Sequence, residues 1–243
     1  MPNPLLAICL VAFLAGLIQG LSGFGSVLVA LPLLVFFLKL STAVPLVSLW
    51  GMAINLMLLW GLWRQLDVRR VVYLTVAAIP GIPLGVYCLR YVPAHLLEMV
   101  LSLTLVGFAG YFFCCQGQVR VLGRAWEVVA GFFSGFLGGS LAASGPPVII
   151  YTALQPWDKD TMKATLTGYF ALSGLIILAL QAWHQLFTRE VLHYGLVSSP
   201  FLVLGVLVGL VGYRRLNTDR YRQVVVGLIT LLGLLTMGKA WQG

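Results

Sequence analysis

The sequence predicts an all-α polytopic membrane protein with two inverted repeats, each with a glycine-broken first helix segment. The 243 residues are 60% hydrophobic and only 9% charged, whereas about a quarter of the residues in soluble proteins are charged. Most apolar blocks have the length of a membrane-spanning helix and lack the ~10-residue alternation of a barrel strand. Residues of the first half also recur, in the same order, in the second half.

The longest uncharged segment comes first and covers residues 5–38. One straight helix of that length would measure roughly 50 Å at ~1.5 Å per residue, against a hydrocarbon core of ~30 Å. Glycines cluster from Gly16 to Gly25, so we expect two helical pieces that meet inside the membrane between Ser22 and Ser26. Irregular backbone at membrane depth is tolerated only where it is buried in protein or lines a cavity. This break is therefore the expected location of a site.

Further helices are expected in the apolar blocks that follow. These blocks cover residues 43–63, 71–89, 96–117, 128–157, 164–183, 191–213 and 223–238. The cysteines lie in apolar segments without C-x-x-C spacing, so we expect neither a metal site nor a cofactor. They are Cys9, Cys88, Cys114 and Cys115.

The two halves of the chain match each other at two nearly equal offsets. An Ala-Gly pair with two following glycines and a proline recurs 115 positions later. A second set of matches, which includes Pro80 and Pro200, has an offset of 120 positions. The chain is therefore interpreted as a duplication. The first transmembrane repeat is predicted at 1–118 and the second, inverted repeat at 119–243.

Basic residues are distributed unequally between two alternating sets of loops. If each first segment consists of two pieces, each half has five elements, and this odd number makes the second repeat inverted. The positive-inside rule then places the larger basic group in the cytoplasm and both termini outside. The larger group contains Arg64, Arg69, Arg70, Arg120, Arg124, Lys159, Lys163, Arg214, Arg215, Arg220 and Arg222, and the smaller contains Lys39, Arg90, Arg189 and Lys239. Because the basic residues lie in short loops, the net charge of +8 does not indicate a nucleic-acid partner. The count does not distinguish broken segments that cross fully from segments that re-enter.

Inverted repeats with broken helices at corresponding positions indicate a secondary transporter whose site lies near the midplane. A helix N-terminus presents unpaired N–H groups and a positive dipole end, which attract anions. Two such ends, at Gly23–Ser26 and Gly138–Ser140, are expected to face each other. The predicted substrate-binding residues are Ser22, Gly23, Gly25, Ser26, Asn55, Gly138, Gly139, Ser140, Ser144 and Thr165. Close helix packing is the preferred interpretation of four other glycines, Gly16, Gly20, Gly131 and Gly135.

The glycine patterns resemble those of a known family. The matching residues are Ala15-Gly16-x3-Gly20-x2-Gly23-Phe24-Gly25 with Pro32, and Ala130-Gly131-x3-Gly135-x2-Gly138-Gly139 with Pro147. They are similar to the paired glycine motifs of the sulfite exporter TauE/SafE family, and the resemblance covers residues 10–240. It implies export of sulfite or organosulfonates across the bacterial cytoplasmic (inner) membrane. The implied partners are a small anionic substrate and the lipid bilayer, and a homo-oligomer is left open.

Two other functions are weighed against a transporter. An anion channel of the same architecture is the nearer alternative, because sequence does not distinguish a gated site from an open pore. A rhomboid-like intramembrane serine protease is suggested by Gly20-Leu21-Ser22-Gly23. Such an enzyme needs a histidine base near the serine, and His95, His184 and His193 lie in or beside loops. We therefore predict that the protein is not an enzyme and has no catalytic residue.

Overall fold

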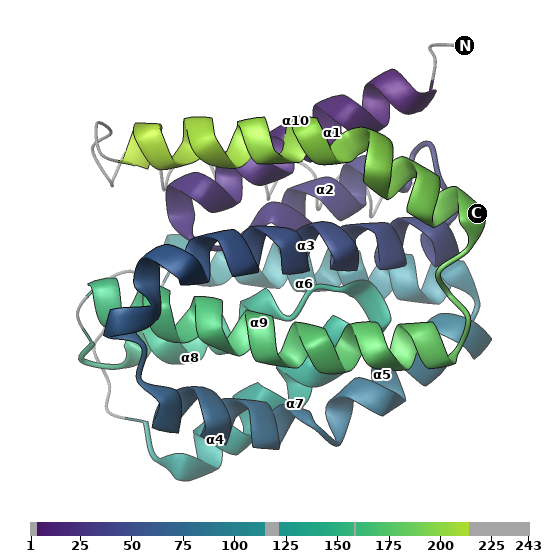
Figure 1. Cartoon of the computed structure of the whole chain (residues 1–243). Helices are drawn as coiled ribbons and strands as arrows, with labels where there is room; N and C mark the ends of the chain where they lie inside the picture. Colours follow the sequence, from purple (N-terminus) through teal and green to yellow (C-terminus); the bar gives the residue numbers. More distant parts are fainter. Residues whose placement is uncertain (1–3, 115–121, 158, 214–243) are drawn as a thin grey trace.

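The computed structural model describes residues 4–114, 122–157 and 159–213. Within these ranges all regular elements are helices, without any strand. The α-helices are α1 (Pro4–Ser22), α2 (Ser26–Leu34), α3 (Leu40–Leu62), α4 (Val68–Ala78), α5 (Gly81–Tyr91), α6 (Ala94–Cys114), α7 (Arg124–Leu141), α8 (Gly145–Leu154), α9 (Lys159–Trp183) and α10 (Arg189–Tyr213), and a 3-10 helix η1 (Trp63–Gln65) follows α3. Figure 1 shows α1 with α10 on one side, α4, α5 and α7 on the other, and α3 and α9 between them.

Several of these helices have the length and composition of membrane spans. Four described helices, α1, α3, α9 and α10, are long and apolar enough to cross a bilayer, and the bent pair α4–α5 makes a fifth candidate. This agrees with the all-helical membrane class predicted from composition. The predicted helix at 223–238 lies outside the described residues.

The first apolar segment breaks where the sequence predicts. Helix α1 ends at Ser22 and α2 begins at Ser26. Between them Gly23 and Gly25 have φ values of 81° and 97°, a left-handed conformation that glycine adopts readily because it has no Cβ. The predicted break between Ser22 and Ser26 is confirmed.

The second break lies later than predicted. Gly138, Gly139 and Ser140, where the sequence predicts a break, belong to the last turn of α7, which ends at Leu141. The chain breaks at Ala142–Ser144, and Ala142 adopts a φ of 54°. The prediction was wrong because these glycines serve helix packing, whereas the following prolines fix the start of α8 at Gly145. Proline is favoured in a first helical turn, where its missing N–H removes no helix bond.

One further break was not predicted. The apolar block 71–89 is divided into α4 and α5, which are bent by 46°. Pro80 is followed by Gly81 and Pro83 at this position, and proline removes a helix hydrogen bond and clashes with the preceding turn. Pro200, its match in the second half, lies inside the continuous helix α10 without these neighbours.

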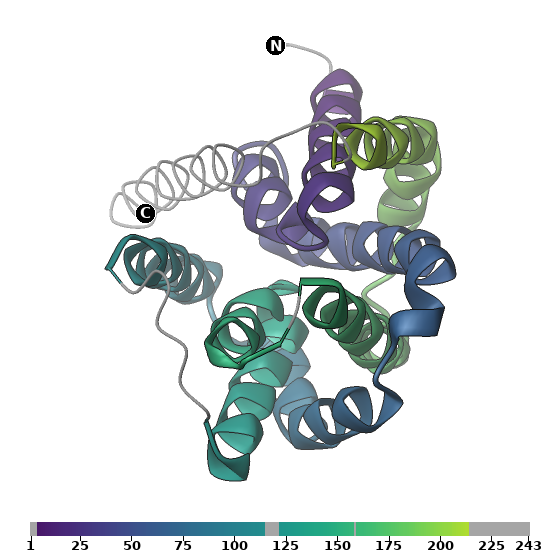
Figure 2. The same ribbon diagram turned by 90° about the vertical axis from the view of Figure 1, so that its left-hand side faces the viewer.

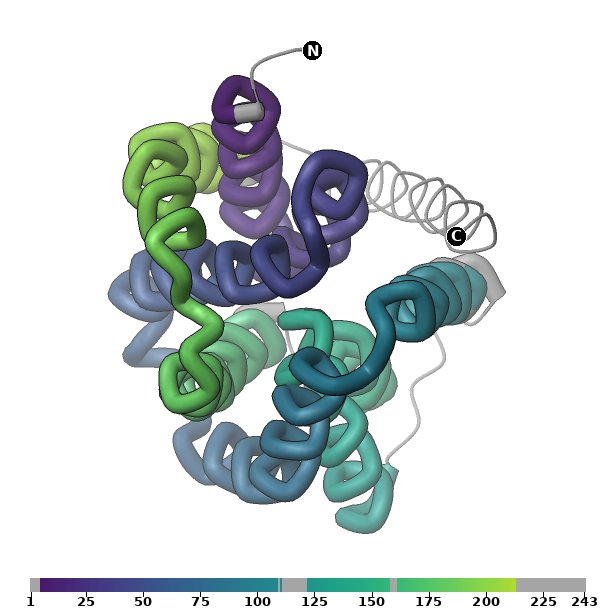
Figure 3. Tube along the Cα trace, turned by 90° about the vertical axis from the view of Figure 1, so that its right-hand side faces the viewer, coloured from purple at the N-terminus to yellow at the C-terminus, as the bar shows by residue number. Residues whose placement is uncertain are grey.

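The connections between helices gather at two opposite ends of the molecule. At one end, the Arg70 guanidinium at the start of α4 lies 4.3 Å from the ring centroid of Trp157, between α8 and α9. At the other end, Arg90 of α5 donates to the carbonyl oxygen of His184, between α9 and α10 (3.4 Å). Figure 2 looks onto the first end and Figure 3 onto the second. The α3–α4 and α8–α9 connections thus share one end, and the α2–α3, α5–α6 and α9–α10 connections share the other. This agrees with the two alternating sets of loops between which the basic residues of the sequence are divided.

Both broken segments return to the end from which they start. The start of α1 and the α2–α3 connection lie at the same end in Figures 1 and 3. In the second half, Gln155 after α8 donates to the carbonyl oxygen of Leu122 before α7 (3.2 Å). Helix α1 has 19 residues and α2 has 9, which gives lengths of about 28 and 13 Å. Each pair is therefore a helical hairpin with a long first helix and a short second helix.

Glycines bring helices of the two halves into backbone contact. Gly16 and Gly20 of α1 lie against the backbone of α10, and Gly131 and Gly135 of α7 lie against α4. A Cβ at any of these positions would overlap the neighbouring helix. The packing interpretation of these glycines is confirmed, and each contact joins a broken segment of one half to a helix of the other half.

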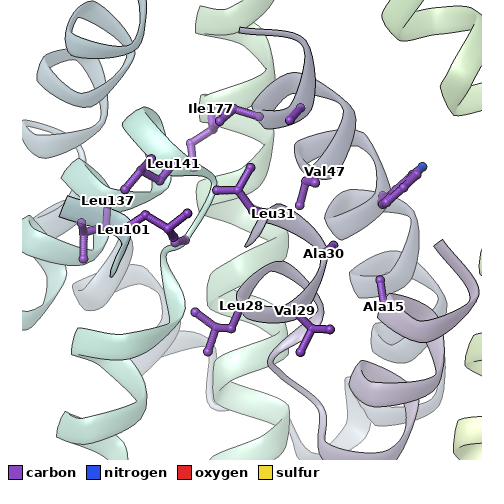
Figure 4. Close-up of a cluster of buried hydrophobic side chains, with 14 of the residues drawn as sticks. Ala15, Leu28, Val29, Ala30, Leu31, Val47, Leu101, Leu137, Leu141 and Ile177 are labelled. Carbon is purple, nitrogen blue, oxygen red and sulfur yellow. The ribbon is translucent and has the colours of Figure 1, made fainter. Parts of the chain in front are cut away.

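Helix α2 is enclosed by neighbouring helices. Leu28, Val29, Ala30 and Leu31 have almost no exposed surface. Figure 4 shows Leu28 and Leu31 on the side of the buried leucines of α6 and α7, and Val29 and Ala30 on the side of Ala15 in α1. The short helix α2 therefore lies in the apolar core, which fixes the position of its N-terminus.

We expect Gly85→Ala to lower stability, because a Cβ at Gly85 would overlap the backbone of Phe136 in α7. Overpacking of this kind typically costs about 1–3 kcal/mol. The measurement is thermal unfolding of the purified protein in detergent. Gly61→Ala is the matched control, since nothing lies within 4 Å of a Cβ there, and it should not lower the unfolding temperature. Equal unfolding temperatures for Gly85→Ala and wild type would contradict this packing.

Candidate functional site

A cavity of about 70 Å³ lies where the two breaks meet α3 and α9. This volume accommodates several water molecules or one small ion. The residues that line it carry no formal charge. They are Gln19, Phe24, Gly25, Ser26, Val27 and Leu28 from the first broken segment, Val47, Ser48, Gly51, Met52 and Asn55 from α3, Ala142, Ala143, Ser144 and Gly145 from the second break, and Phe170, Gly174 and Ile177 from α9.

The N-terminus of α2 forms one wall of the cavity. Gly25, the N-cap residue, supplies no side-chain cap, and the residues from Ser26 to Leu28 form the first turn. The N–H groups of a first turn have no partner inside their own helix. They are therefore donors at the positive end of the helix dipole, beside a cavity.

The N-terminus of α8 forms the facing wall with fewer donors. The hydroxyl of Ser144, the N-cap residue, does not cap the helix, so it is available to a ligand. Pro146 and Pro147 occupy the first turn and have no N–H group. The two helix ends are therefore unequal: α2 offers mainly backbone N–H groups, whereas α8 offers Gly145 N–H and the Ser144 hydroxyl.

A hydrogen-bond chain fixes the second break. The Tyr169 hydroxyl of α9 donates to the Ser134 hydroxyl of α7 (2.7 Å). The Ser134 hydroxyl in turn donates to the carbonyl oxygen of Ser144. Tyr169 and Ser134 have no exposed surface, so this chain holds the irregular backbone in place from behind the cavity.

Gln19 connects the first break to α3. Its amide nitrogen donates to the Asn55 side-chain oxygen (2.7 Å), and its amide oxygen accepts from the Ser26 hydroxyl. Because the Asn55 oxygen is occupied, the Asn55 NH₂ group is the part that can serve a ligand. Gln19 was not among the predicted site residues, although a polar amide within an apolar span usually faces the protein interior.

The remaining lining is mostly apolar, with Ser48 as one further polar side chain. The Ser48 hydroxyl donates to the Val44 carbonyl oxygen (3.0 Å) and accepts from the Gln181 amide nitrogen (3.0 Å). Ser48 was also not among the predicted site residues, because no pattern in the neighbouring sequence distinguishes it from an ordinary buried serine.

Four predicted site residues meet at the cavity: Gly25, Ser26, Asn55 and Ser144. They come from three separate parts of the chain, the two breaks and the middle of α3. Their convergence places both helix ends and an amide donor around one small volume.

Two other predicted residues lie at the first break but outside the cavity lining. The Ser22 hydroxyl donates to the Ile18 carbonyl oxygen (2.8 Å) and accepts from Phe24 N–H (3.2 Å). Gly23 lies against the side chain of Lys163, so close that a Cβ at Gly23 would be 2.9 Å from the Lys163 Cγ atom. Both residues shape the turn and do not face the cavity.

The four other predicted residues lie behind the cavity or away from it. The Ser140 hydroxyl donates to the Phe136 carbonyl oxygen within α7 (2.8 Å). Gly139 packs against the backbone of α5, and a Cβ at Gly138 would overlap the Ser144 hydroxyl. Thr165 is buried on α9 and does not line the cavity.

This arrangement suits a small anion better than a cation. It combines amide, hydroxyl and backbone N–H donors with two helix N-termini and lacks a carboxylate among the lining residues. Charge-assisted bonds from N–H groups to oxyanions are stronger than neutral ones. The lining also has no histidine, lysine or arginine, so neither acid–base catalysis nor a formal counter-charge is supplied there.

Comparison with known proteins identifies similar sequences. The family described as sulfite exporter TauE/SafE matches residues 8–236. The chain is also 24% identical over 201 residues to a protein of Cupriavidus necator described as a probable sulfite/organosulfonate exporter TauE, and the alignment covers 81% of this chain and 78% of that protein. No solved structure matches.

We expect Gln19→Leu to destabilise the protein by about 1–3 kcal/mol, because it leaves buried Asn55 and Ser26 without their partner. Equilibrium unfolding in mixed detergent micelles measures the loss. The double variant with Asn55→Leu should lose at least ~0.5 kcal/mol less than the sum of the single variants. Strict additivity would show that the two amides do not interact.

Proposed function

This chain belongs to the sulfite exporter TauE/SafE family, and from that membership we propose that it transports a small sulfur-containing oxyanion such as sulfite or an organosulfonate. The observation that carries the proposal is the uncharged cavity at two uncapped helix N-termini. A sulfite or sulfonate head has several acceptor oxygens that need donors. The first turn of α2, the Asn55 NH₂ group and the Ser144 hydroxyl supply them.

We further propose that transport occurs by alternating access between two inverted repeats. The support is a common spacing of 119 positions: from Ser22 to Leu141 and from Ser26 to Gly145, which bound the breaks (141 − 22 and 145 − 26). The left-handed residues Gly23 and Ala142 share it (142 − 23). This spacing is one helical turn longer than the 115 positions of the glycine match, because Gly16 and Gly20 meet glycines at both offsets: Gly131 and Gly135 at 115, and Gly135 and Gly139 at 119.

The walls of the cavity share the same spacing. Gly51 and Asn55 of α3 correspond to Phe170 and Gly174 of α9 (170 − 51 and 174 − 55), and all four line the cavity. A site built from corresponding parts of two repeats is the arrangement from which inverted-repeat transporters alternate access.

A channel and a protease receive less support. The relative from Cupriavidus necator is described as an exporter, which favours a transporter over an open pore. The Ser22 hydroxyl bonds the backbone of α1 and the break. His184 contacts Arg90 at a loop end, and none of the three histidines lines the cavity.

We expect sulfite or an organosulfonate to stabilise the purified protein more than sulfate, acetate or bicarbonate at matched ionic strength. An anion at ~100 times its dissociation constant adds about 2.7 kcal/mol to stability, and thermal unfolding in detergent measures this gain. Ser144→Ala should weaken the stabilisation because it removes a cavity donor. Ser199→Ala is the control, since this hydroxyl bonds within α10. Stabilisation by all the anions alike, or by none, would argue against the proposed substrate class.

We propose that the α3–α4 and α8–α9 connections face the cytoplasm of a bacterial inner membrane and that the termini lie outside. The reason is that basic residues of the larger group lie at these two connections. The test uses single cysteines in a cysteine-free background. His95→Cys should react with a membrane-impermeant maleimide added to spheroplasts, whereas Gln65→Cys should react only after lysis. The reverse labelling pattern would overturn this orientation.

A further inference from the structure

Three buried side-chain atoms in the described ranges have no hydrogen-bond partner: the hydroxyls of Thr165 and Thr167 and the amide oxygen of Gln181. Both threonines are 0% exposed. Burying a hydroxyl without a bond costs free energy, so such a group calls for an explanation. The position of Thr167 on α9 supplies one.

Thr167 lies on the side of α9 that faces the cavity. Phe170 and Gly174 line the cavity and follow Thr167 by three and seven residues. Because successive helix positions differ by about 100°, both lie within roughly 60° of Thr167 around the helix axis. Thr165 is rotated by roughly 200° from Thr167 and therefore faces the other side.

Lys163 extends the same face by one turn toward the α8–α9 connection. Its side chain packs against Gly23 of the first break, since a Cβ built on Gly23 would lie 2.9 Å from Lys163 Cγ and 3.1 Å from Cε. Gly23 precedes Phe24, which lines the cavity. Lys163, Thr167 and the cavity thus follow one another along α9, with about 6 Å of helix axis between the first two.

We propose that Thr167 and Lys163 form a second binding position for the oxyanion, between the cavity and the end that carries the α8–α9 connection. This inference rests on the anion transport proposed above. The Lys163 ammonium attracts the anion, and the Thr167 hydroxyl donates to it as it passes. The hydroxyl is enclosed in this conformation, so the anion reaches it when the Gly23–Phe24 segment moves away from Lys163. Left-handed glycines on both sides of Phe24 give that segment the backbone freedom to move.

The test compares Thr167→Val with Thr165→Val, a control that is equally buried and equally unpaired. Valine keeps the shape of threonine and removes the hydroxyl. For Thr167→Val we expect an unfolding temperature at or above that of wild type, sulfite binding by calorimetry within twofold of wild type, and at least a tenfold lower sulfite flux into proteoliposomes. Thr165→Val should match wild type in flux and binding.

Lys163→Met tests the electrostatic part of the proposal. It keeps an unbranched stem against Gly23 and removes the charge. We expect a severalfold higher KM for sulfite presented from the α8–α9 side and an unchanged kcat. The KM should also depend less on salt concentration than in wild type. Lys163→Arg should restore the KM.

The outcomes separate the two proposals. Wild-type protein that neither binds nor transports any sulfur oxyanion overturns the proposed function itself. Wild-type protein that binds sulfite, together with a Thr167→Val variant of normal flux, overturns only the second binding position. A lower unfolding temperature for Thr167→Val, or equal flux losses in both valine variants, also overturns it, because the hydroxyl would then act structurally.

Discussion

The structure depends on where the chain places the unpaired backbone N–H groups of the two helices that start at its breaks. A helix that starts inside a membrane leaves its first N–H groups without partners, and lipid cannot supply them. Here both such starts are turned inward and meet at one small cavity between α3 and α9. The surrounding apolar core around α2 holds that geometry without any charged residue in the cavity wall.

The two breaks reach this common place by different local chemistry. The first uses Gly23 and Gly25, whose left-handed conformations cost glycine little. The second uses two prolines after Ser144 and a left-handed Ala142, supported by buried hydroxyls from α7 and α9. The result is a pair of similar turns with unequal donor sets. The α2 end carries backbone N–H donors throughout its first turn, whereas two prolines leave the α8 end with fewer.

Sequence reasoning predicted the parts of this fold that depend on local properties. Apolar length identified the helices, and the glycine cluster from Gly16 to Gly25 located the first break. The same logic misplaced the second break, because Gly138 and Gly139 have a packing role that depends on a distant helix. It also missed the bend at Pro80, since its match Pro200 stays within one continuous helix and only the neighbouring residues differ.

The cavity was predicted in outline for a similar reason. Gly25 and Ser26 follow from the break itself, and Asn55 stands out as an amide inside an apolar block. Gln19 and Ser48 line the cavity through the rotation of their helices and through partners far away in sequence. These depend on tertiary packing, which no local pattern encodes.

The packing of each half's first helix against helices of the other half has a consequence for how the protein is made. The glycine face of α1 packs against α10, and that of α7 packs against α4 and α5, so the ribosome completes α1 long before its main partner exists. Domains generally fold as units during synthesis, but here the glycine face of each half's first helix has its partner in the other half. The α1–α10 contact therefore forms only after α10 has been synthesised, so the packing of the two halves is completed late.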